Sequence, residues 1–295
     1  MLISVLMPVY NEEKFIKEAI DSVLSQDCEY SLELCIVDDI STDNTFNYIK
    51  YNYANEKRVK IYKNPNKGKN NAFNYAYKKA NGDFFILFAG DDTLEPKSLG
   101  QRINPLKDKA EPSITLCKLR MFSEDKKYDN IVTPKDPSKG SLSGGCMAIN
   151  KAFADIVFPI PEILGNEDIW IVNHVKFLNN VSTIHVPTVG INYRIHPNNS
   201  QPRLSSFEQR SRSMHHRAIA HSVFLEKYKD SMNKKDISKL NAMVTAENLR
   251  YKEDTLSLLF VSGLDFSTKV KVVVYSNKFL YWIRMKFFSL FSGKG

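Results

Sequence analysis

The 295-residue sequence has few cysteines, and their arrangement matches no zinc site. Cys28, Cys35, Cys117 and Cys146 form no CxxC pair, and their spacings differ from those of known zinc ligands. Cys35 lies in an apolar run, where we expect a small core residue. The sequence therefore predicts reduced cysteines and a cytosolic protein.

Long apolar runs are also missing. No segment reaches the roughly 18–20 apolar residues that cross a bilayer. The apolar start LISVLMPVY has no basic leader and runs into a turn signal, so it predicts a strand rather than a signal peptide. Hydrophobic residues make up 43% and charged residues 25% of the chain, which excludes disorder over its whole length.

The first turn has no glycine. A dinucleotide-dependent dehydrogenase would place GxGxxG after its first strand, whereas this turn reads MPVYNEE. The net charge of +8 favours anionic partners, although a surplus of solubilising lysine would also explain it. A nucleic-acid-binding module would not explain acids at strand ends, because these repel phosphate unless a metal ion lies between them. We therefore expect no nucleic-acid partner.

Short apolar runs alternate with amphipathic segments in the first 105 residues. Strands are expected at 2–9, 32–37, 59–62 and 84–88, and helices at 12–26, 41–54 and 66–82. Asn11 is expected to cap the first helix. Apolar strands separated by helices predict an α/β fold with a parallel sheet covered on both faces.

Polar pairs follow three of these strands. Tyr10-Asn11, Asp38-Asp39 and Asp91-Asp92 each come directly after an apolar run. In parallel sheets ligands bind beyond the carboxyl ends of the strands. The three pairs therefore predict one polar cleft, the alternative being that they only form turns and helix caps.

The pattern loosens after residue 110. We expect a strand at 114–119, a polar loop at 124–139, a helix at 165–178 and a strand at 181–193. The chain then becomes helical. These features predict a domain at 1–204, with a nucleotide-binding half at about 1–105 and an acceptor half at about 106–204, and a helical extension at 205–295.

Three segments together carry a family resemblance. SVLMPVYNEEKFIKEAIDSVLSQ, VDDISTDNT and NPNKGKNNAFNYAYKKANGDFFILFAGDD resemble the family 2 glycosyltransferases of the GT-A fold, over roughly the first two-thirds of the chain. The resemblance implies a Rossmann-like, mostly parallel sheet flanked by helices. It implies inverting transfer from a nucleotide-sugar to a hydroxyl of a glycan or lipid-linked acceptor in surface polysaccharide synthesis. A UDP-sugar is the donor expected first. A catalytically inactive member that only binds its ligands is the alternative.

The resemblance also assigns a metal site. The family usually has Asp-x-Asp where this sequence has Ala89-Gly90-Asp91, so Asp91 is the expected ligand of Mn²⁺ or Mg²⁺. Asp92 is expected either to support Asp91 or to cap the following helix. Carboxylate oxygens are ligands that such ions prefer. His196, in the motif YRIHPNNS, is expected to complete the metal shell or to bind a phosphate oxygen.

Further donor contacts follow from the same resemblance. Asp39 is expected to bind the nucleotide base, and Ile40 stands where the family usually has glycine. The remaining residues expected to contact the donor lie in three loops, and they are Pro8, Tyr10, Glu12, Lys69 and Arg194. The family often has arginine where this chain has Phe73.

Glu167-Asp168 resembles the acidic pair on the acceptor side of the family. An inverting transfer needs a base that takes the proton from the acceptor hydroxyl. Asp168 is the expected base and Glu167 the second choice. The alternative is that both acids only stabilise a helix N-terminus.

The carboxyl-terminal stretch 271–295 combines aromatic and basic residues. This composition favours an interfacial helix on an anionic membrane surface, and a helix packed on protein is the alternative. We therefore expect a cytoplasmic protein. If the stretch forms an interfacial helix, the protein is expected to be peripheral at the cytoplasmic face of the membrane. Removal of the residues after about 270 should then release the protein from lipid.

Overall fold

The structure is a computed structural model, and it describes residues 1–295 except 125, 127, 197–198, 200–205 and 288–295. The chain divides into two compact units. The first, Met1–Asn199, is called the N-terminal unit below, and the second, Ser200–Gly295, is called the helical unit. The end of the motif YRIHPNNS and the last eight residues fall partly or wholly outside the described residues.

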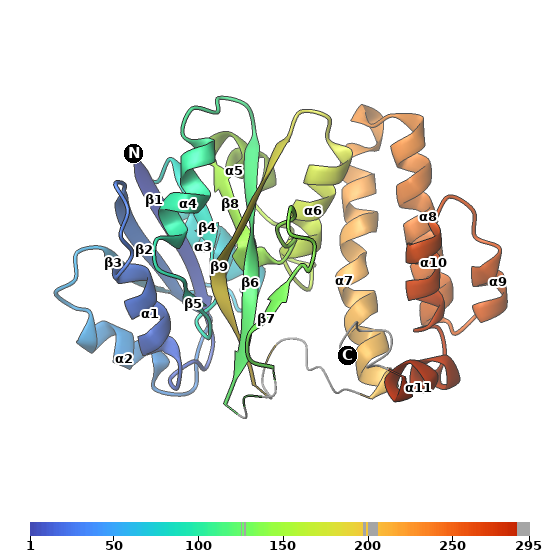
Figure 1. The fold of residues 1–295 in the computed structure, drawn as a ribbon, viewed down its shortest axis with the longest axis horizontal. Coiled ribbons are helices and arrows are strands. Elements are labelled where there is room, and N and C mark those ends of the chain that lie inside the picture. The colour runs from blue at the N-terminus through green and yellow to red at the C-terminus, as the bar shows by residue number, and fades with distance from the viewer. Residues whose placement is uncertain (125, 127, 197–198, 200–205, 288–295) are drawn as a thin grey trace. The chain divides into compact units, whose positions relative to one another are not determined.

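Four parallel strands form the first half of the sheet in the N-terminal unit (Figure 1). They lie in the order β3-β2-β1-β4, with bounds Val59–Lys63, Ser31–Asp38, Leu2–Val9 and Phe84–Leu87. Nearly all residues of β1, β2 and β4 are buried, because helices cover both faces. The predicted α/β fold class is confirmed.

The second half of the sheet mixes strand directions. β8 (Met147–Asn150) lies antiparallel between β4 and β6 (Ser113–Ser123), and β9 (Ser182–Ile195) runs parallel to β6. β5 (Thr93–Leu94) pairs with β9, and β7 (Ile131–Thr133) pairs with β6. The expectation of a loop throughout 124–139 is therefore wrong at β7.

The helices of the N-terminal unit are shorter than the sequence predicts. Their bounds are Ile16–Leu24 (α1), Thr45–Asn52 (α2), Lys69–Lys79 (α3), Ser98–Ile103 (α4), Lys151–Val157 (α5) and Asp168–Phe177 (α6), with short 3-10 turns at Asn104–Leu106 (η1) and Gly144–Cys146 (η2). Ile16, Ala19, Ile20 and Val23 form the buried face of α1. All four cysteines are free thiols, and Cys35 is fully buried as predicted.

Asn11 does not cap α1, so this expectation is wrong. Its backbone has a positive φ of 55°, and α1 begins only at Ile16. The Asn11 side chain instead accepts a hydrogen bond from the Thr42 N–H at 2.8 Å. A short polar side chain of this kind tolerates left-handed backbone and bonds to neighbouring loops, so Asn11 joins the loops that follow β1 and β2.

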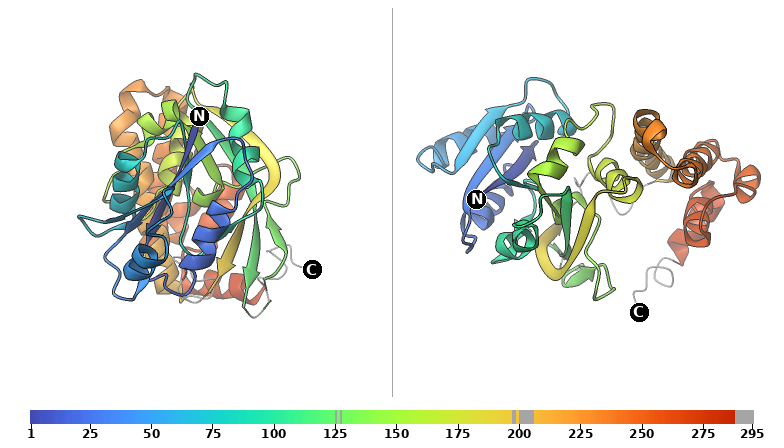
Figure 2. Two further views of the ribbon diagram at one scale, coloured as in Figure 1. Left: turned by 90° about the vertical axis from the view of Figure 1, so that its left-hand side faces the viewer. Right: turned by 90° about the horizontal axis from the view of Figure 1, so that it is seen from above.

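The helical unit contains α7 (Phe207–Tyr228), η3 (Lys229–Ser231), α8 (Lys234–Tyr251), α9 (Thr255–Leu259), α10 (Phe266–Val273) and α11 (Lys278–Lys286), which Figure 2 shows from two further sides. Arg250 is fully buried and holds several of these helices together. It donates to Ser211 O of α7 at 3.0 Å and to Glu247 Oε1 at 2.6 Å. No helix in the described part of the chain is long and apolar enough to cross a membrane.

Candidate active site

The carboxyl ends of β1, β2 and β4 bring the three predicted polar pairs to one edge of the sheet. The loops after β1 and β2 contact each other directly, since Asn11 N donates to Ser41 Oγ at 3.0 Å and Asp39 N donates to Val9 O at 2.8 Å. The close packing of Gly90 joins the loop after β4 to them, because a Cβ there would lie 3.2 Å from Cγ of Glu12. The pairs therefore share one site.

Asp39 is held in a defined orientation by the segment before α3. Its Oδ1 accepts hydrogen bonds from Asn64 Nδ2 and from the Gly68 N–H, both at 2.7 Å. Gly68 has φ of 136°, a conformation that side chains rarely adopt. Asp38 closes the turn after β2, since its Oδ2 accepts from Ser41 N at 3.1 Å. The Asp38 carboxylate thus orients the loop, and the Asp39 carboxylate lies beside the start of α3.

Ile40 replaces the usual glycine without changing the handedness of the turn. Its φ is 63°, in the left-handed region that favours glycine. A β-branched residue in this conformation is strained by roughly 1–2 kcal/mol. The side chain is 49% exposed, so packing does not offset much of this strain.

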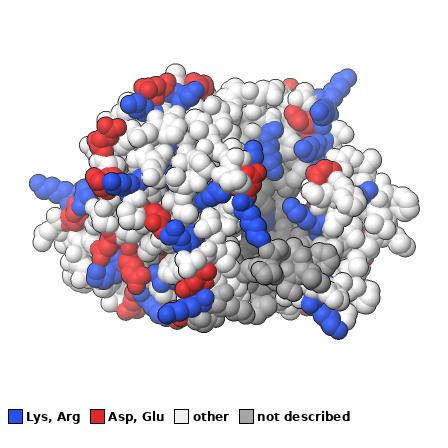
Figure 3. All heavy atoms as spheres, in the orientation of Figure 1, with Lys and Arg blue, Asp and Glu red and all other residues white. Residues whose placement is uncertain are grey.

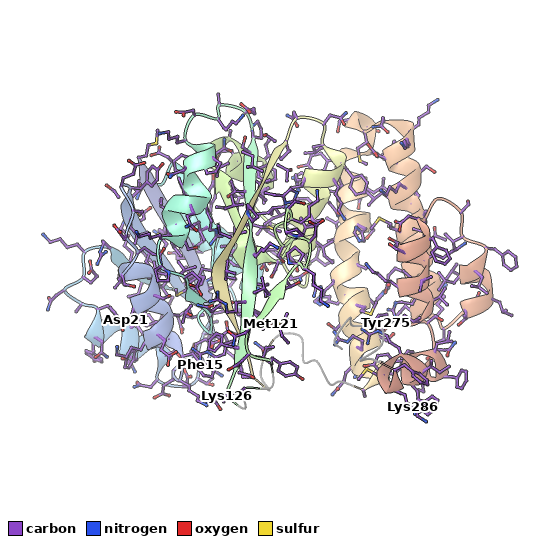
Figure 4. The ribbon with its side chains drawn as sticks, viewed as in Figure 1. Phe15, Asp21, Met121, Lys126, Tyr275 and Lys286 are labelled. Carbon is purple, nitrogen blue, oxygen red and sulfur yellow. The ribbon has the colours of Figure 1, made fainter. Side chains whose placement is uncertain are left out.

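Asp91 and His196 lie together, as a shared role requires. His196 Nε2 is 3.0 Å from Asp91 Oδ2, and Asn199 Nδ2 is 3.4 Å from the same oxygen. The side chains of His196 and Asp91 are nearly buried, with 10% and 14% of their surface exposed. The Phe15 ring, just before α1 (Figure 4), packs against the His196 ring with 5.0 Å between centroids. Asp91 and His196 are 105 residues apart in sequence, and the family resemblance had assigned both to one metal site.

Arg194 supports the turn that carries the two acids. Its backbone N–H donates to Asp92 Oδ1 at 2.9 Å, and its Nε donates to Asp91 O at 2.8 Å. The guanidinium lies 4.5 Å from the ring centroids of both Phe15 and Phe122, and it pairs with Glu18 at 2.6 Å. These contacts fix Arg194 between two aromatic faces. Its predicted contact with a diphosphate stays a prediction.

The acids at this edge perturb one another. Burial, reinforced by the Asp91 and Asp43 carboxylates, raises the pKa of Glu12 to about 8. Burial and the neighbouring Asp91 also raise the pKa of Asp92 well above its usual range. Carboxylates behave in this way when too little positive charge faces them. The edge of the sheet is therefore a place where an added cation would be stabilised.

Lys69 joins the donor side of the site to the predicted acceptor side. Its Nζ lies 3.1 Å and 3.0 Å from the two carboxylate oxygens of Glu167. Burial would lower the pKa of Lys69, but Glu167, Asp168 and Asp91 together raise it above its usual value. Because 42% of the Lys69 side chain is exposed, water screens these interactions. All three acids therefore act electrostatically on this amine, and Glu167 contacts it directly.

Glu167 and Asp168 differ in their surroundings. Glu167 is 5% exposed, whereas Asp168, the first residue of α6, is half-buried and accepts the Ile169 N–H at 2.7 Å. The segment before them is fixed on α3, because Asn70 Nδ2 donates to Leu164 O at 2.7 Å. Gly144 allows Glu167 to approach the backbone, since a Cβ there would lie 2.5 Å from its Oε1.

Other predicted residues have surroundings of their own. Pro8 is buried within β1, opposite Val37 of β2. Tyr10 is 43% exposed, and the Lys67 amine lies 4.6 Å from its ring centroid. Phe73, which stands where the family often has arginine, is buried in α3 and is 2% exposed.

Sequence reasoning missed Asn64, Phe15, Phe122 and Glu18. Asn64 is the first residue of the segment NPNKGKNNAFNYAYKKANGDFFILFAGDD, but within its NKGKNNAFN part only Lys69 was expected to contact the donor. The other three contact Arg194 across 72 to 179 residues of chain (122 to 194 and 15 to 194), and no local pattern indicates such contacts.

The described residues contain no group of three or more His, Cys, Asp or Glu that could hold a metal ion, so the residues expected to bind one are tested by their chemistry. Asp91 and His196 supply a carboxylate oxygen and an imidazole nitrogen, both of which suit first-row divalent ions such as Mn²⁺. Ions of this class commonly take one or two protein carboxylates and complete their shell with substrate phosphates. The donor set therefore fits a metal that binds together with a diphosphate.

Comparison with known proteins supports the family resemblance. Residues 4–140 match the model of glycosyl transferase family 2. The chondroitin synthase of Escherichia coli is 38% identical over 98 residues, which is 33% of this chain and 14% of that protein. The putative glycosyltransferase EpsE of Bacillus subtilis is 30% identical over 145 residues, covering 48% of this chain and 52% of that one.

A transferase of Methanococcus voltae is 36% identical over 120 residues, covering 38% of this chain and 36% of that one. Its description is dolichyl N-acetyl-alpha-D-glucosaminyl phosphate 3-beta-D-2,3-diacetamido-2,3-dideoxy-beta-D-glucuronosyltransferase. The chain thus spans between 14% and 52% of the length of these three relatives.

A solved structure shares the fold. The crystal structure of S. aureus TarS 1-349 in complex with UDP-GlcNAc aligns with a TM-score of 0.60 and 20% identity, covering 94% of this chain and 79% of that one. The predicted GT-A fold is confirmed by this likeness.

The strain at Ile40 predicts a stabilising substitution. Ile40→Gly should raise the free energy of unfolding by about 0.5–1 kcal/mol, because relief of the left-handed strain exceeds the entropy that glycine adds to the unfolded chain. Urea denaturation measures this value. Ile163→Gly is the control, since Ile163 is 65% exposed in a turn without positive φ, and it should destabilise. Equal destabilisation by both variants would contradict the strain.

The raised pKa of Glu12 predicts a pH dependence of stability. The folded protein holds this proton up to about pH 8, whereas the unfolded chain releases it near 4.5, so stability falls as pH rises through this window. Relative to Glu12→Gln, the wild type should lose on the order of 3 kcal/mol between pH 5 and pH 8. Denaturation without divalent cations measures the difference. Exposed Glu226→Gln is the control, and parallel curves for wild type and Glu12→Gln would disprove the effect.

Proposed function

Because residues 4–140 match the model of glycosyl transferase family 2, we propose that this protein is an inverting glycosyltransferase that moves a sugar from a nucleotide-sugar to a hydroxyl group. One observation carries the proposal. Lys69 pairs with Glu167 and lies within the electrostatic influence of both Asp168 and Asp91. These interactions support a single site in which the residues expected to bind the leaving diphosphate and the residue expected to accept the proton act on one bound donor.

The donor in this proposal is a UDP-sugar. Asp39, held by Asn64 and Gly68, accepts from the ring N–H of uracil, and the half-exposed Tyr10 ring stacks on the base. Asp38 Oδ1 and Asn64 Oδ1 are buried and have no hydrogen-bond donor among the described residues, which suits a ligand that donates. The relative in the TarS crystal structure carries UDP-GlcNAc, which supports the same nucleotide.

Asp91 and His196 would hold a divalent ion, Mn²⁺ or Mg²⁺, together with the diphosphate. The bound ion would neutralise charge on the departing nucleoside diphosphate. Arg194 keeps the Asp91-Asp92 turn in place through its bonds to Asp91 O and Asp92 Oδ1. A fixed turn supplies this stabilisation without reorganisation during transfer.

Asp168 takes the proton from the acceptor hydroxyl as that oxygen attacks the anomeric carbon. It is the better candidate of the two acids because it is half-buried, whereas Glu167 is only 5% exposed. The Glu167–Lys69 ion pair holds the start of α6, and so the base, beside the donor. Inversion needs only this one carboxylate, because a single displacement forms no covalent enzyme intermediate.

The acceptor in this proposal is a glycan or lipid-linked glycan of a surface polysaccharide. Relatives described as a chondroitin synthase and as a transferase acting on a dolichyl-linked sugar phosphate support this class. A lipid-linked acceptor would place the reaction at the cytoplasmic face of a membrane.

A screen of nucleotide-sugars with and without Mn²⁺ tests the function. A UDP-sugar at 100 times its Kd should stabilise the folded state by about 2.7 kcal/mol, which raises the melting temperature. Slow release of UDP in the same reactions should require the metal. A purine nucleotide-sugar serves as the comparison. If no nucleotide-sugar stabilises the protein, the proposed donor site is wrong, and if stabilisation occurs without any turnover, the inactive alternative replaces the enzyme.

Two substitutions separate the proposed roles. Asp91→Ala should abolish metal-dependent release of nucleoside diphosphate, because it removes the carboxylate of the Asp91–His196 pair. Asp168→Asn should keep the donor Kd within about threefold and reduce transfer by about 10²–10⁴-fold, the usual contribution of a general base. Exposed Asp108→Asn should leave both unchanged. Full transfer by either active-site variant would refute its assignment.

A further inference from the structure

Aromatic side chains of the helical unit are exposed to an unusual degree. Phe260 and Phe266 are 85% and 83% exposed, and Phe279 and Trp282 are 67% and 53% exposed. They come from α9, α10 and α11 or from the segments that join them. Soluble proteins expose single apolar side chains freely, but a concentration in one region marks an interaction site.

The three helices meet at one corner. The Oγ1 of Thr255, at the start of α9, lies 2.7 Å from Oγ of Ser276, and Asn277 Nδ2 donates to it at 2.9 Å. Ser276 and Asn277 join α10 to α11, and α9 and α10 also pack on α8. In Figure 3 the part of this unit around α9 shows mostly uncharged atoms, whereas charges of both signs are interspersed over the N-terminal unit. The helices that carry the exposed rings are therefore neighbours in this unit.

The charged side chains on two of these helices, α10 and α11, are all positive. Residues 266–287 contain five lysine or arginine residues and no acid. On α11 the Lys286 amine lies 4.8 Å from the Trp282 ring, and the Phe279 and Trp282 rings are 6.3 Å apart. The neighbouring acid Asp265 caps α10 by accepting from Thr268 N at 2.9 Å, so its charge is compensated at that helix terminus.

We propose that α9, α10 and α11 form a docking surface for an anionic phospholipid membrane. The α9–α11 surface is defined here by Phe260, Phe266, Phe279, Trp282, Lys271 and Lys286. Aromatic rings insert at the level of the headgroups and lysines bind the lipid phosphates, the arrangement of an interfacial anchor. A second copy of this chain fits less well, because a self-complementary contact would bring the basic faces of α10 and α11 together.

A membrane-binding surface would bring the enzyme to a lipid-linked acceptor, so this inference rests on the proposed function for its biological meaning. Sequence reading placed the membrane contact in the stretch 271–295 alone. The structure adds Phe260 of the segment after α9 and Phe266 of α10, which the corner at Thr255 joins to α11. The experiment below uses neither donor nor acceptor, so its failure and the failure of the transferase proposal are separate results.

The two tryptophans give a direct measurement. Trp170 is fully buried in the N-terminal unit, whereas Trp282 is 53% exposed on the proposed surface. Vesicles of phosphatidylcholine with 30% phosphatidylglycerol should shift the emission of the full chain to the blue, and brominated lipid should quench it. Flotation should show at least tenfold stronger binding than to phosphatidylcholine alone, with the difference lost in high salt.

Matched variants assign the effect to the surface. Phe279→Ser with Trp282→Ser should abolish flotation, and Tyr51→Ser, 74% exposed on α2, should not change it. Lys271→Gln with Lys286→Gln should reduce the preference for anionic vesicles, while Lys50→Gln with Lys57→Gln, exposed in the N-terminal unit, should retain it. Circular dichroism confirms that each variant is folded.

Three outcomes would overturn the inference. The first is that anionic vesicles leave the emission of Trp282 in the wild type unchanged. This measurement needs no variant. The second is equal binding to zwitterionic vesicles. The third is a dimer in sedimentation that Phe279→Ser with Trp282→Ser dissociates, which would assign the surface to a second copy of the chain.

Discussion

Repulsion among carboxylates at the edge of the parallel sheet is the constraint that the rest of the site satisfies. Glu12, Asp91 and Asp92 lie close enough that burial and mutual repulsion raise the pKa values of Glu12 and Asp92. A fold that only needed stable turns would place asparagine or serine here at lower cost. Positive charge at this site would offset the repulsion among the carboxylates. A metal ion bound together with a nucleoside diphosphate would provide such charge.

The chain already supplies part of that charge from distant segments. Strand β9 runs parallel to β6 and ends at Ile195, so its last residues carry Arg194 and His196 to the turn after β4. Arg194 bonds to both acids of that turn, and His196 contacts Asp91. Helix α3 supplies Lys69 from the opposite side, toward Glu167. The second half of the sheet therefore stabilises the site formed by the first half, which explains why the two halves form one unit.

Local patterns in the sequence were sufficient to predict the parallel strands, the helices between them and the convergence of Asp39 and Asp91. These features depend on periodicity and on the rule that parallel strands end at one edge. The contacts of Arg194 with Phe15 and Phe122 were not predictable, because the strand register and aromatic packing that produce them are properties of the folded chain. Asn11 shows the same limit, since a residue that looks like a helix cap instead bonds to the neighbouring loop.

The departures from the family pattern need not weaken the site. Ile40 keeps the left-handed backbone that glycine usually provides, and Phe73 is buried away from the solvent-facing side of α3. Ala89 removes an acid from a region where carboxylates already repel one another, so the remaining acids face a smaller electrostatic cost. Asp91 then depends more strongly on His196, whose ring is fixed by Phe15. The missing acid at position 89 therefore does not by itself favour the inactive alternative.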